Sequence, residues 1–135
     1  MPDLDFSVLE KAIASLGEAI VLSRENPGDE IVRDAVIQRF EYTYELCWKL
    51  LKRVLEQEGF SSPAIQVLSY KDLMREGATL GFIDDPVAWF RYREARNLTV
   101  HTYDRSNADT VYLTALAFLE DARKLYEKLV RTNND

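Results

Sequence analysis

The sequence predicts an all-α fold, a four-to-five-helix up-and-down bundle in a single domain over residues 1–135. Apolar residues recur every three or four positions along most of the chain. No segment alternates apolar and polar residues between paired turn signals, as strands of a sheet would. Hydrophobic residues make up 47% of the chain and charged residues 30%, with five Gly and four Pro. This composition is typical of a soluble helical protein.

The first two helices are expected at residues 4 to about 24 and about 30 to 58. The apolar stripe of the first helix has spacings of three and four: Phe6, Leu9, Ile13, Leu16 and Ile20. The sequence "ENPGDE" ends this helix, and Asp29 can accept a hydrogen bond from the amides that open the next one. The second helix is the longest, and Gly59 is expected to cap its end.

The remaining helices follow from local start signals. A shorter helix is expected around residues 70–79. The sequence "DDPVAWF" predicts a helix start, with Asp85 as the N-cap and Pro86 in the first turn, and this helix is expected to carry the only histidine. Ser106 or Asn107 is expected to start the last helix. The tail, residues 130–135, is expected to fray.

The charge balance argues against general nucleic-acid binding. Seventeen Lys and Arg against twenty-three Asp and Glu give a net charge of −6. Such a charge opposes broad attachment to RNA or to an anionic membrane. One stretch, residues 91–105, reverses this balance with arginines that outnumber its acids: Arg91, Arg93, Arg96 and Arg105. Any RNA contact is therefore expected to be local, within this basic segment.

The sequence also limits where in the cell the protein could lie and which cofactors it could bind. The N-terminus lacks a basic, then apolar, secretory signal, and no segment is apolar over the length of a membrane span. The single cysteine, Cys47, excludes an internal disulfide, and one Cys with one His cannot form a zinc site in one chain. The sequence predicts a cytoplasmic protein with no membrane contact, no metal and no cofactor.

The stretch "EARNLTVHTY", residues 94–103, groups residues suited to phosphate chemistry. On an ideal helix Asn97 and His101 lie one turn apart, and Tyr103 lies almost above Arg96. Two further charged residues fall in the same arc and are assigned to substrate binding: Arg93 and Asp104. The segment is therefore expected to present one polar face with a guanidinium, a carboxamide, an imidazole and a phenol.

This set suits phosphate chemistry without a metal, and, if the protein is an enzyme, it would be a metal-independent endoribonuclease. Arginine grips phosphate oxygens bidentately, and a histidine with its ordinary pKa of about 6.5 exchanges protons near neutral pH. Arg96 and His101 would be catalytic, and Asn97 would support the imidazole or contact phosphate. A two-fold dimer would supply the second imidazole that acid and base catalysis need. By spacing alone, a lone Arg-x4-His more often marks a structural or merely solvated histidine than a catalytic one.

A family resemblance covers nearly the whole chain. The segments "QRFEYTYELCWKLLKRVLEQEG" at 38–59 and "EARNLTVHTYD" at 94–104 resemble the nucleotidyltransferase substrate-binding protein family. That family is similar to the HepT half of MNT/HepT toxin-antitoxin modules, in the HEPN superfamily. The resemblance implies a dimeric helical bundle encoded beside a small nucleotidyltransferase of the MNT type.

The resemblance also implies roles for individual residues. Arg96 and His101 match the Arg-x4-6-His motif of HEPN ribonucleases, and Asn97 matches its polar residue. In HepT-like toxins the motif extends to a tyrosine that the partner transferase adenylylates, with ATP as co-substrate, which silences the ribonuclease. Tyr103 occupies that position. The alternative is a non-catalytic module or adaptor that holds a nucleotide or another substrate for the transferase.

Other candidates on the long second helix have two readings each. Trp48 and Tyr42 could stack nucleobases, although aromatics at helical spacing are usually core, and Tyr42 is the exception to expect. Glu41 and Glu45 are read as surface or salt-bridged carboxylates, or as a glutamate that faces the basic segment. Cys47 could be a nucleophile, but its place in the apolar stripe predicts an inert core residue.

The aromatic pair that precedes the motif also has two readings. Trp89 and Phe90 could form a dimer seam or belong to the core.

Overall fold

The structure is a computed structural model, which describes residues 4–58 and 68–134. Within them it contains five α-helices, one 3₁₀ turn and no strand. The elements are α1 (Ser7–Glu25), α2 (Glu30–Gln57), α4 (Tyr70–Thr79), α5 (Pro86–Leu98), η1 (Thr99–His101) and α6 (Arg105–Asn134). The predicted all-α fold class is confirmed. No helix in this part of the chain has both the length and the apolar character needed to cross a bilayer.

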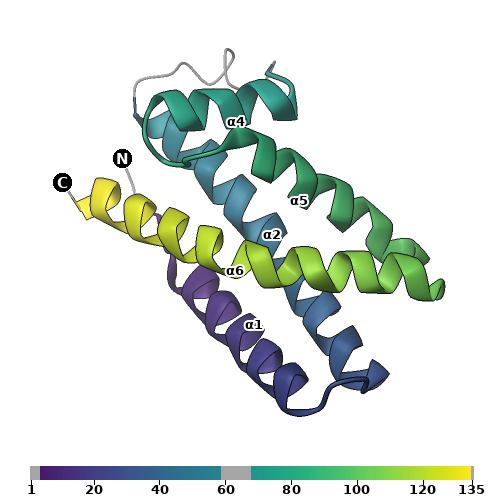
Figure 1. Ribbon diagram of the computed structural model, residues 1–135. Coiled ribbons are helices and arrows are strands. Elements are labelled where there is room, and N and C mark those ends of the chain that lie inside the picture. The colour runs from purple at the N-terminus through teal and green to yellow at the C-terminus, as the bar shows by residue number, and fades with distance from the viewer. Residues whose placement is uncertain (1–3, 59–67, 135) are drawn as a thin grey trace.

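Helix α2 is the central element of the bundle. It contacts every other α-helix of the described residues. Figure 1 shows that α1, α2, α5 and α6 run in alternating directions, as expected of an up-and-down bundle, with α4 across one end. Helix α6 packs on α1, α2 and α5. The end of α5, η1 and the start of α6 therefore lie together, and η1 also contacts α2.

The helix starts follow the predicted capping residues. The Asp29 carboxylate accepts hydrogen bonds from the first-turn amides of α2, at 2.9 and 3.2 Å. The Asp85 carboxylate accepts one from Val87 N at 3.0 Å, with Pro86 at the first helical position. Gly28, in the turn between α1 and α2, has a φ of 84°, which glycine adopts without a steric penalty. The cap predicted at Gly59 lies outside the described residues.

An aromatic cluster forms the centre of the core. The Phe118 ring packs edge-on against four other rings, at centroid distances of 5.1 to 6.2 Å: Phe40, Tyr44, Trp89 and Tyr92. These residues come from α2, α5 and α6, so the cluster fixes the three helices against one another. Trp89 is only 2% exposed, which makes it a core residue and not part of a dimer seam.

Three helix boundaries differ from the prediction. Helix α1 begins at Ser7 and not at residue 4. Helix α5 ends at Leu98 and does not continue through the histidine. The Thr99 hydroxyl donates to the Arg96 carbonyl at 2.7 Å, a side-chain bond that competes with helical pairing. Helix α6 begins at Arg105, because the preceding aspartate caps it.

At the C-terminus, α6 continues to Asn134, through the segment expected to fray. Leu129 is fully buried, and the Asn133 amide donates to the Leu4 carbonyl at 3.4 Å.

Candidate functional site

Arg96 lies in the last turn of α5 and faces α2. Its Nε donates a hydrogen bond to Glu45 Oε1 at 2.7 Å, a contact between residues 51 positions apart in sequence. The side chains are 34% and 26% exposed, so the ion pair is partly shielded from water. A glutamate on the long helix thus faces the basic segment, which was one of the two readings of Glu41 and Glu45.

The second oxygen of the Glu45 carboxylate is also held. Glu45 Oε2 accepts a hydrogen bond from Trp48 Nε1 at 3.3 Å and lies 3.5 Å from Lys49 Nζ. Trp48 is half-buried, and its ring packs edge-on against Tyr70 at a centroid distance of 6.2 Å. The carboxylate that binds Arg96 therefore has a fixed orientation, set by a packed indole.

His101 and Tyr103 lie side by side on the connection between α5 and α6. His101 Nδ1 is 3.2 Å from the Tyr103 hydroxyl, and the rings meet edge-on at 5.9 Å. Both side chains are exposed, Tyr103 at 85%. The His101 carbonyl accepts hydrogen bonds from Asp104 N and Asn107 Nδ2, both at 3.2 Å. These bonds tie the backbone of the histidine to the start of α6.

The predicted site residues do not share one helical face. Because α5 ends at Leu98, the helical spacing that placed His101 above Asn97 and Tyr103 above Arg96 does not apply, and that part of the prediction is wrong. The structure instead pairs His101 with Tyr103 in a turn and pairs Arg96 with a residue from another helix. Asn97 is exposed on the last turn of α5.

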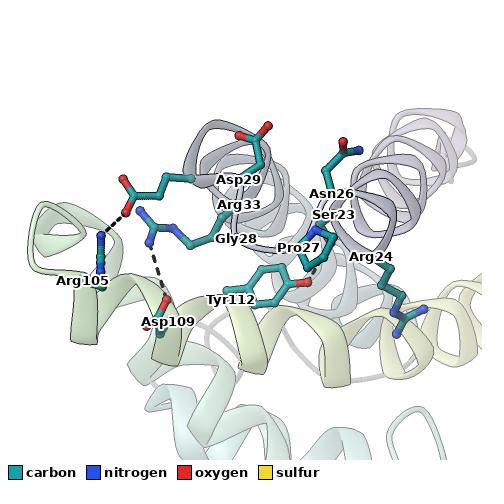
Figure 2. A pocket seen from close by; sticks show the side chains of 11 residues that line it. Ser23, Arg24, Asn26, Pro27, Gly28, Asp29, Arg33, Arg105, Asp109 and Tyr112 are labelled. Atoms are coloured by element: carbon teal, nitrogen blue, oxygen red, sulfur yellow. Dashed lines mark hydrogen bonds and ion pairs between the residues drawn. The ribbon is translucent and has the colours of Figure 1, made fainter.

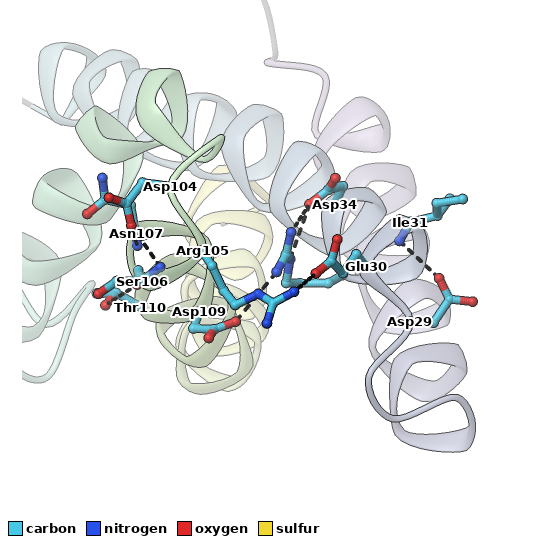
Figure 3. Close-up of polar contacts among 11 residues, drawn as sticks. Asp29, Glu30, Ile31, Asp34, Asp104, Arg105, Ser106, Asn107, Asp109 and Thr110 are labelled. Carbon is cyan, nitrogen blue, oxygen red and sulfur yellow. Dashed lines mark hydrogen bonds and ion pairs between the residues drawn. The ribbon is translucent and has the colours of Figure 1, made fainter.

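The two residues assigned to substrate binding have structural partners. The guanidinium carbon of Arg93 lies 4.4 Å from the centroid of the Tyr70 ring, in the geometry of a cation–π contact. The Asp104 carboxylate accepts hydrogen bonds from Ser106 N at 2.8 Å and Asn107 N at 3.3 Å, as Figure 3 shows. Asp104 is thus the N-cap of α6. Its position two residues before Ser106 is a capping signal that the sequence analysis missed.

The other sequence candidates are placed as follows. Cys47 is completely buried, as predicted, and burial raises the pKa of its thiol. Tyr42 is 39% exposed, and its hydroxyl is 2.7 Å from Ser15 Oγ. Phe90 is half-buried, with the charged groups of Lys71 and Arg75 over its ring at 5.4 and 5.5 Å.

A separate hollow lies between the α1–α2 turn and α6, with a volume of about 550 Å³. Figure 2 shows its floor, where the Tyr112 hydroxyl is 2.8 Å from Ser23 Oγ. At its side Arg33 Nη1 lies 3.6 Å from an Asp109 oxygen. None of the predicted site residues lines this hollow.

At the mouth of the hollow, Arg105 Nη2 donates to Glu30 Oε1 at 2.6 Å (Figure 3). This pair joins the start of α6 to the start of α2. Arg33 and Arg105 both already bind carboxylates. The polar side chains around the hollow therefore serve to hold α2 against α6.

Comparison with known proteins gives the family. A sequence model of the family described as nucleotidyltransferase substrate binding protein like matches residues 4–131. The chain belongs to this family. A curated relative from Haemophilus influenzae, "Probable ribonuclease HepT", is 38% identical over 138 residues, which cover 96% of this chain and 94% of that protein. The chain is therefore a HepT-like helical protein.

Two solved structures share the fold. One, from Haemophilus influenzae, is described as the fold of a substrate binding domain of a nucleotidyltransferase. It has a TM-score of 0.86 and 34% identity, and the match covers 93% of this chain and 98% of that chain. The other, from Thermus thermophilus, has a TM-score of 0.74 and 31% identity over 90% of this chain and 98% of that chain. These two structures thus share the helical arrangement of this chain over at least 90% of its length.

Proposed function

We propose that the chain is a metal-independent endoribonuclease of the HepT type, with Arg96 and His101 as its catalytic residues. The observation that carries the proposal is the exposed imidazole of His101, whose Nδ1 faces the Tyr103 hydroxyl. Among the described residues no hydrogen bond engages Nε2, so this atom can meet a substrate. The name of the Haemophilus relative, "Probable ribonuclease HepT", supports the same reading.

The reaction that fits these groups is transesterification within RNA. The 2′-oxygen attacks the adjacent phosphorus, a P–O2′ bond forms, and the P–O5′ bond breaks. The 2′-hydroxyl proton passes to one imidazole, and the leaving 5′-oxygen receives a proton from an imidazolium. Arg96 stabilises the extra negative charge on the pentacoordinate phosphorus. The products carry a 2′,3′-cyclic phosphate and a 5′-hydroxyl.

The proposal requires two copies of the chain. A single imidazole cannot act as base and acid in the same step, and each chain has one histidine. A two-fold dimer that brings the two α5–α6 connections together would supply both. The exposure of His101 and Val100 is compatible with such a contact.

The test is RNA cleavage by the purified protein in EDTA. The wild-type protein should cleave transfer or messenger RNA and leave cyclic phosphate ends, and His101→Ala should not. Equal cleavage by the two proteins, or cleavage lost in EDTA, would rule out this mechanism.

We also propose that a small nucleotidyltransferase of the MNT type is the partner and that it adenylylates Tyr103. The phenolic oxygen attacks the α-phosphorus of ATP, pyrophosphate leaves, and the phenolic proton is released. Because the hydroxyl is beside His101, the added nucleotide would cover the imidazole and place a negative phosphate next to it. Mass spectrometry after incubation with the transferase and Mg-ATP should find one AMP on Tyr103.

A second candidate function is a non-catalytic module that holds a nucleotide or other substrate for the transferase. It is favoured by the description of the Haemophilus structure as a substrate binding domain of a nucleotidyltransferase. This candidate predicts a stable complex with the transferase, no RNA cleavage by the wild-type protein and no AMP on Tyr103.

A further inference from the structure

We infer that Glu45 is a positioning residue for Arg96, which holds the guanidinium by one edge and directs its terminal amino groups to the substrate phosphate. The inference rests on the proposed ribonuclease function. It concerns a residue of α2, far from the motif in sequence, that touches Arg96 and not the reacting atoms.

The atom that Glu45 engages is the first argument. The hydrogen bond runs from Arg96 Nε to Glu45 Oε1 at 2.7 Å. Among the described residues, no side chain hydrogen-bonds to the terminal Nη1 and Nη2 atoms of Arg96. A guanidinium held in this way keeps its two terminal amino groups for a bidentate contact with phosphate oxygens.

The rigidity of the carboxylate is the second argument. Glu45 Oε2 accepts from Trp48 Nε1 at 3.3 Å, and the Trp48 ring packs edge-on against Tyr70 at 6.2 Å. The Tyr70 hydroxyl donates to the Trp89 carbonyl of α5 at 3.1 Å. A series of packed and hydrogen-bonded groups thus leads from α5 through Tyr70, Trp48 and Glu45 back to Arg96 on the same helix.

The hydrogen bond to Glu45 restricts the rotamers of the Arg96 side chain before the substrate arrives. A free arginine side chain loses rotamer entropy when it binds phosphate. Misplacement of a catalytic group by about 1 Å can cost roughly 100-fold in rate. The carboxylate therefore orients the guanidinium before the phosphate binds.

The test compares Glu45→Ala with a matched control, Glu41→Ala. Glu41 lies one turn earlier on α2, is also half-buried, and forms no ion pair in the described part of the chain. With a short RNA of defined sequence, Glu45→Ala should lower kcat by roughly 10- to 100-fold with little change in KM. Glu41→Ala should keep the wild-type kcat.

Two further variants separate orientation from charge. Glu45→Gln keeps an oxygen that can accept from Arg96 Nε, so its kcat should lie between those of the wild type and Glu45→Ala. Trp48→Phe keeps a ring but removes the N–H that fixes the carboxylate, and it should lower kcat by a few-fold. Equal losses for Glu45→Gln and Glu45→Ala would overturn the orienting role.

A readout independent of activity is the NMR signal of the Arg96 Nε–H. It should be protected from exchange in the wild-type protein and in Glu41→Ala, and lost in Glu45→Ala. Thermal unfolding of each variant checks that it is folded.

The outcomes distinguish the two proposals. An active wild-type protein whose Glu45→Ala variant keeps its kcat would overturn the positioning role alone. An inactive wild-type protein would overturn the proposed function, and the role of Glu45 with it.

Discussion

The Nδ1 atom of His101 lies 3.2 Å from the phenolic oxygen of Tyr103, and both side chains are exposed on the connection between α5 and α6. A chemical modification of the Tyr103 hydroxyl would therefore alter the surroundings of the His101 imidazole. A phosphodiester on the phenol would remove its O–H donor and bring a negative charge beside the imidazole. One modification would thus change the hydrogen bonding, the electrostatics and the accessibility of the proposed base.

Tyr103→Phe should separate modification from cleavage. The variant cannot accept AMP, so its mass should stay unchanged after incubation with the transferase and Mg-ATP. Cleavage of RNA should fall by less than about 10-fold, because a single hydrogen bond to the imidazole, worth about 1 kcal/mol, is lost. Tyr42→Phe is the control, since Tyr42 is another exposed tyrosine and should not affect AMP addition. AMP on the Tyr103→Phe variant would refute the assignment of the acceptor.

Asp104 should prove to be a capping residue. Asp104→Ala should lower the free energy of unfolding by about 1 kcal/mol, because the amides of Ser106 and Asn107 lose their acceptor. Asp104→Asn should keep most of the stability, since asparagine caps helices about as well as aspartate. Urea unfolding measures both. A loss of RNA cleavage without loss of stability in Asp104→Asn would instead support the substrate-binding role predicted from the sequence.

Removal of the hydroxyl should affect the stability of the protein differently at two buried tyrosines. The Tyr44 hydroxyl is buried and has no hydrogen-bond partner among the described residues. Tyr44→Phe should therefore leave the stability unchanged or raise it by up to about 1 kcal/mol. The Tyr92 hydroxyl donates to Asp121, and Tyr92→Phe should cost about 1 kcal/mol or more. Chemical unfolding of the two variants at neutral pH tests this contrast, and an equal loss in both would contradict it.

The protein should lose stability above about pH 10. Burial raises the pKa of Tyr44 and Tyr92 above the ordinary value of 10.0, and for Tyr92 the hydrogen bond to Asp121 adds to the effect. Above this pH the unfolded chain releases phenolic protons that the folded protein retains, so the free energy of unfolding falls as the pH rises. The stabilising contribution is complete below pH 10 and is lost above it.

The Tyr44→Phe variant isolates one of these groups. Its stability relative to the wild type should increase by roughly 1.4 kcal/mol per pH unit above pH 10. Urea unfolding of both proteins from pH 9 to 11 measures the difference. A difference that does not change with pH would mean that Tyr44 ionises equally in both states.

The fold could be predicted well from local signals. The spacing of apolar residues indicates the helices, and the capping residues Asp29 and Asp85 indicate where two of them begin. The end of α5 could not be predicted, because the spacing of residues 94–104 is compatible with a continuous helix. The helix ends at Leu98 because side-chain hydrogen bonds of Thr99 and Asp104 replace helical backbone hydrogen bonds there. The motif residues could be chosen from their chemistry. The contact between Glu45 and Arg96 could only be suspected, because it depends on how α2 and α5 pack.

The break after Leu98 has a consequence for the tolerance of this motif to insertions. In a continuous helix, one added residue would rotate every later side chain by about 100°. Here the carbonyl of His101 is anchored to Asp104 and Asn107, while Arg96 is anchored to another helix. An extra residue between the two anchors would lengthen the turn and leave both ends in place. This fold should therefore accept one more residue between the arginine and the histidine without moving either anchor.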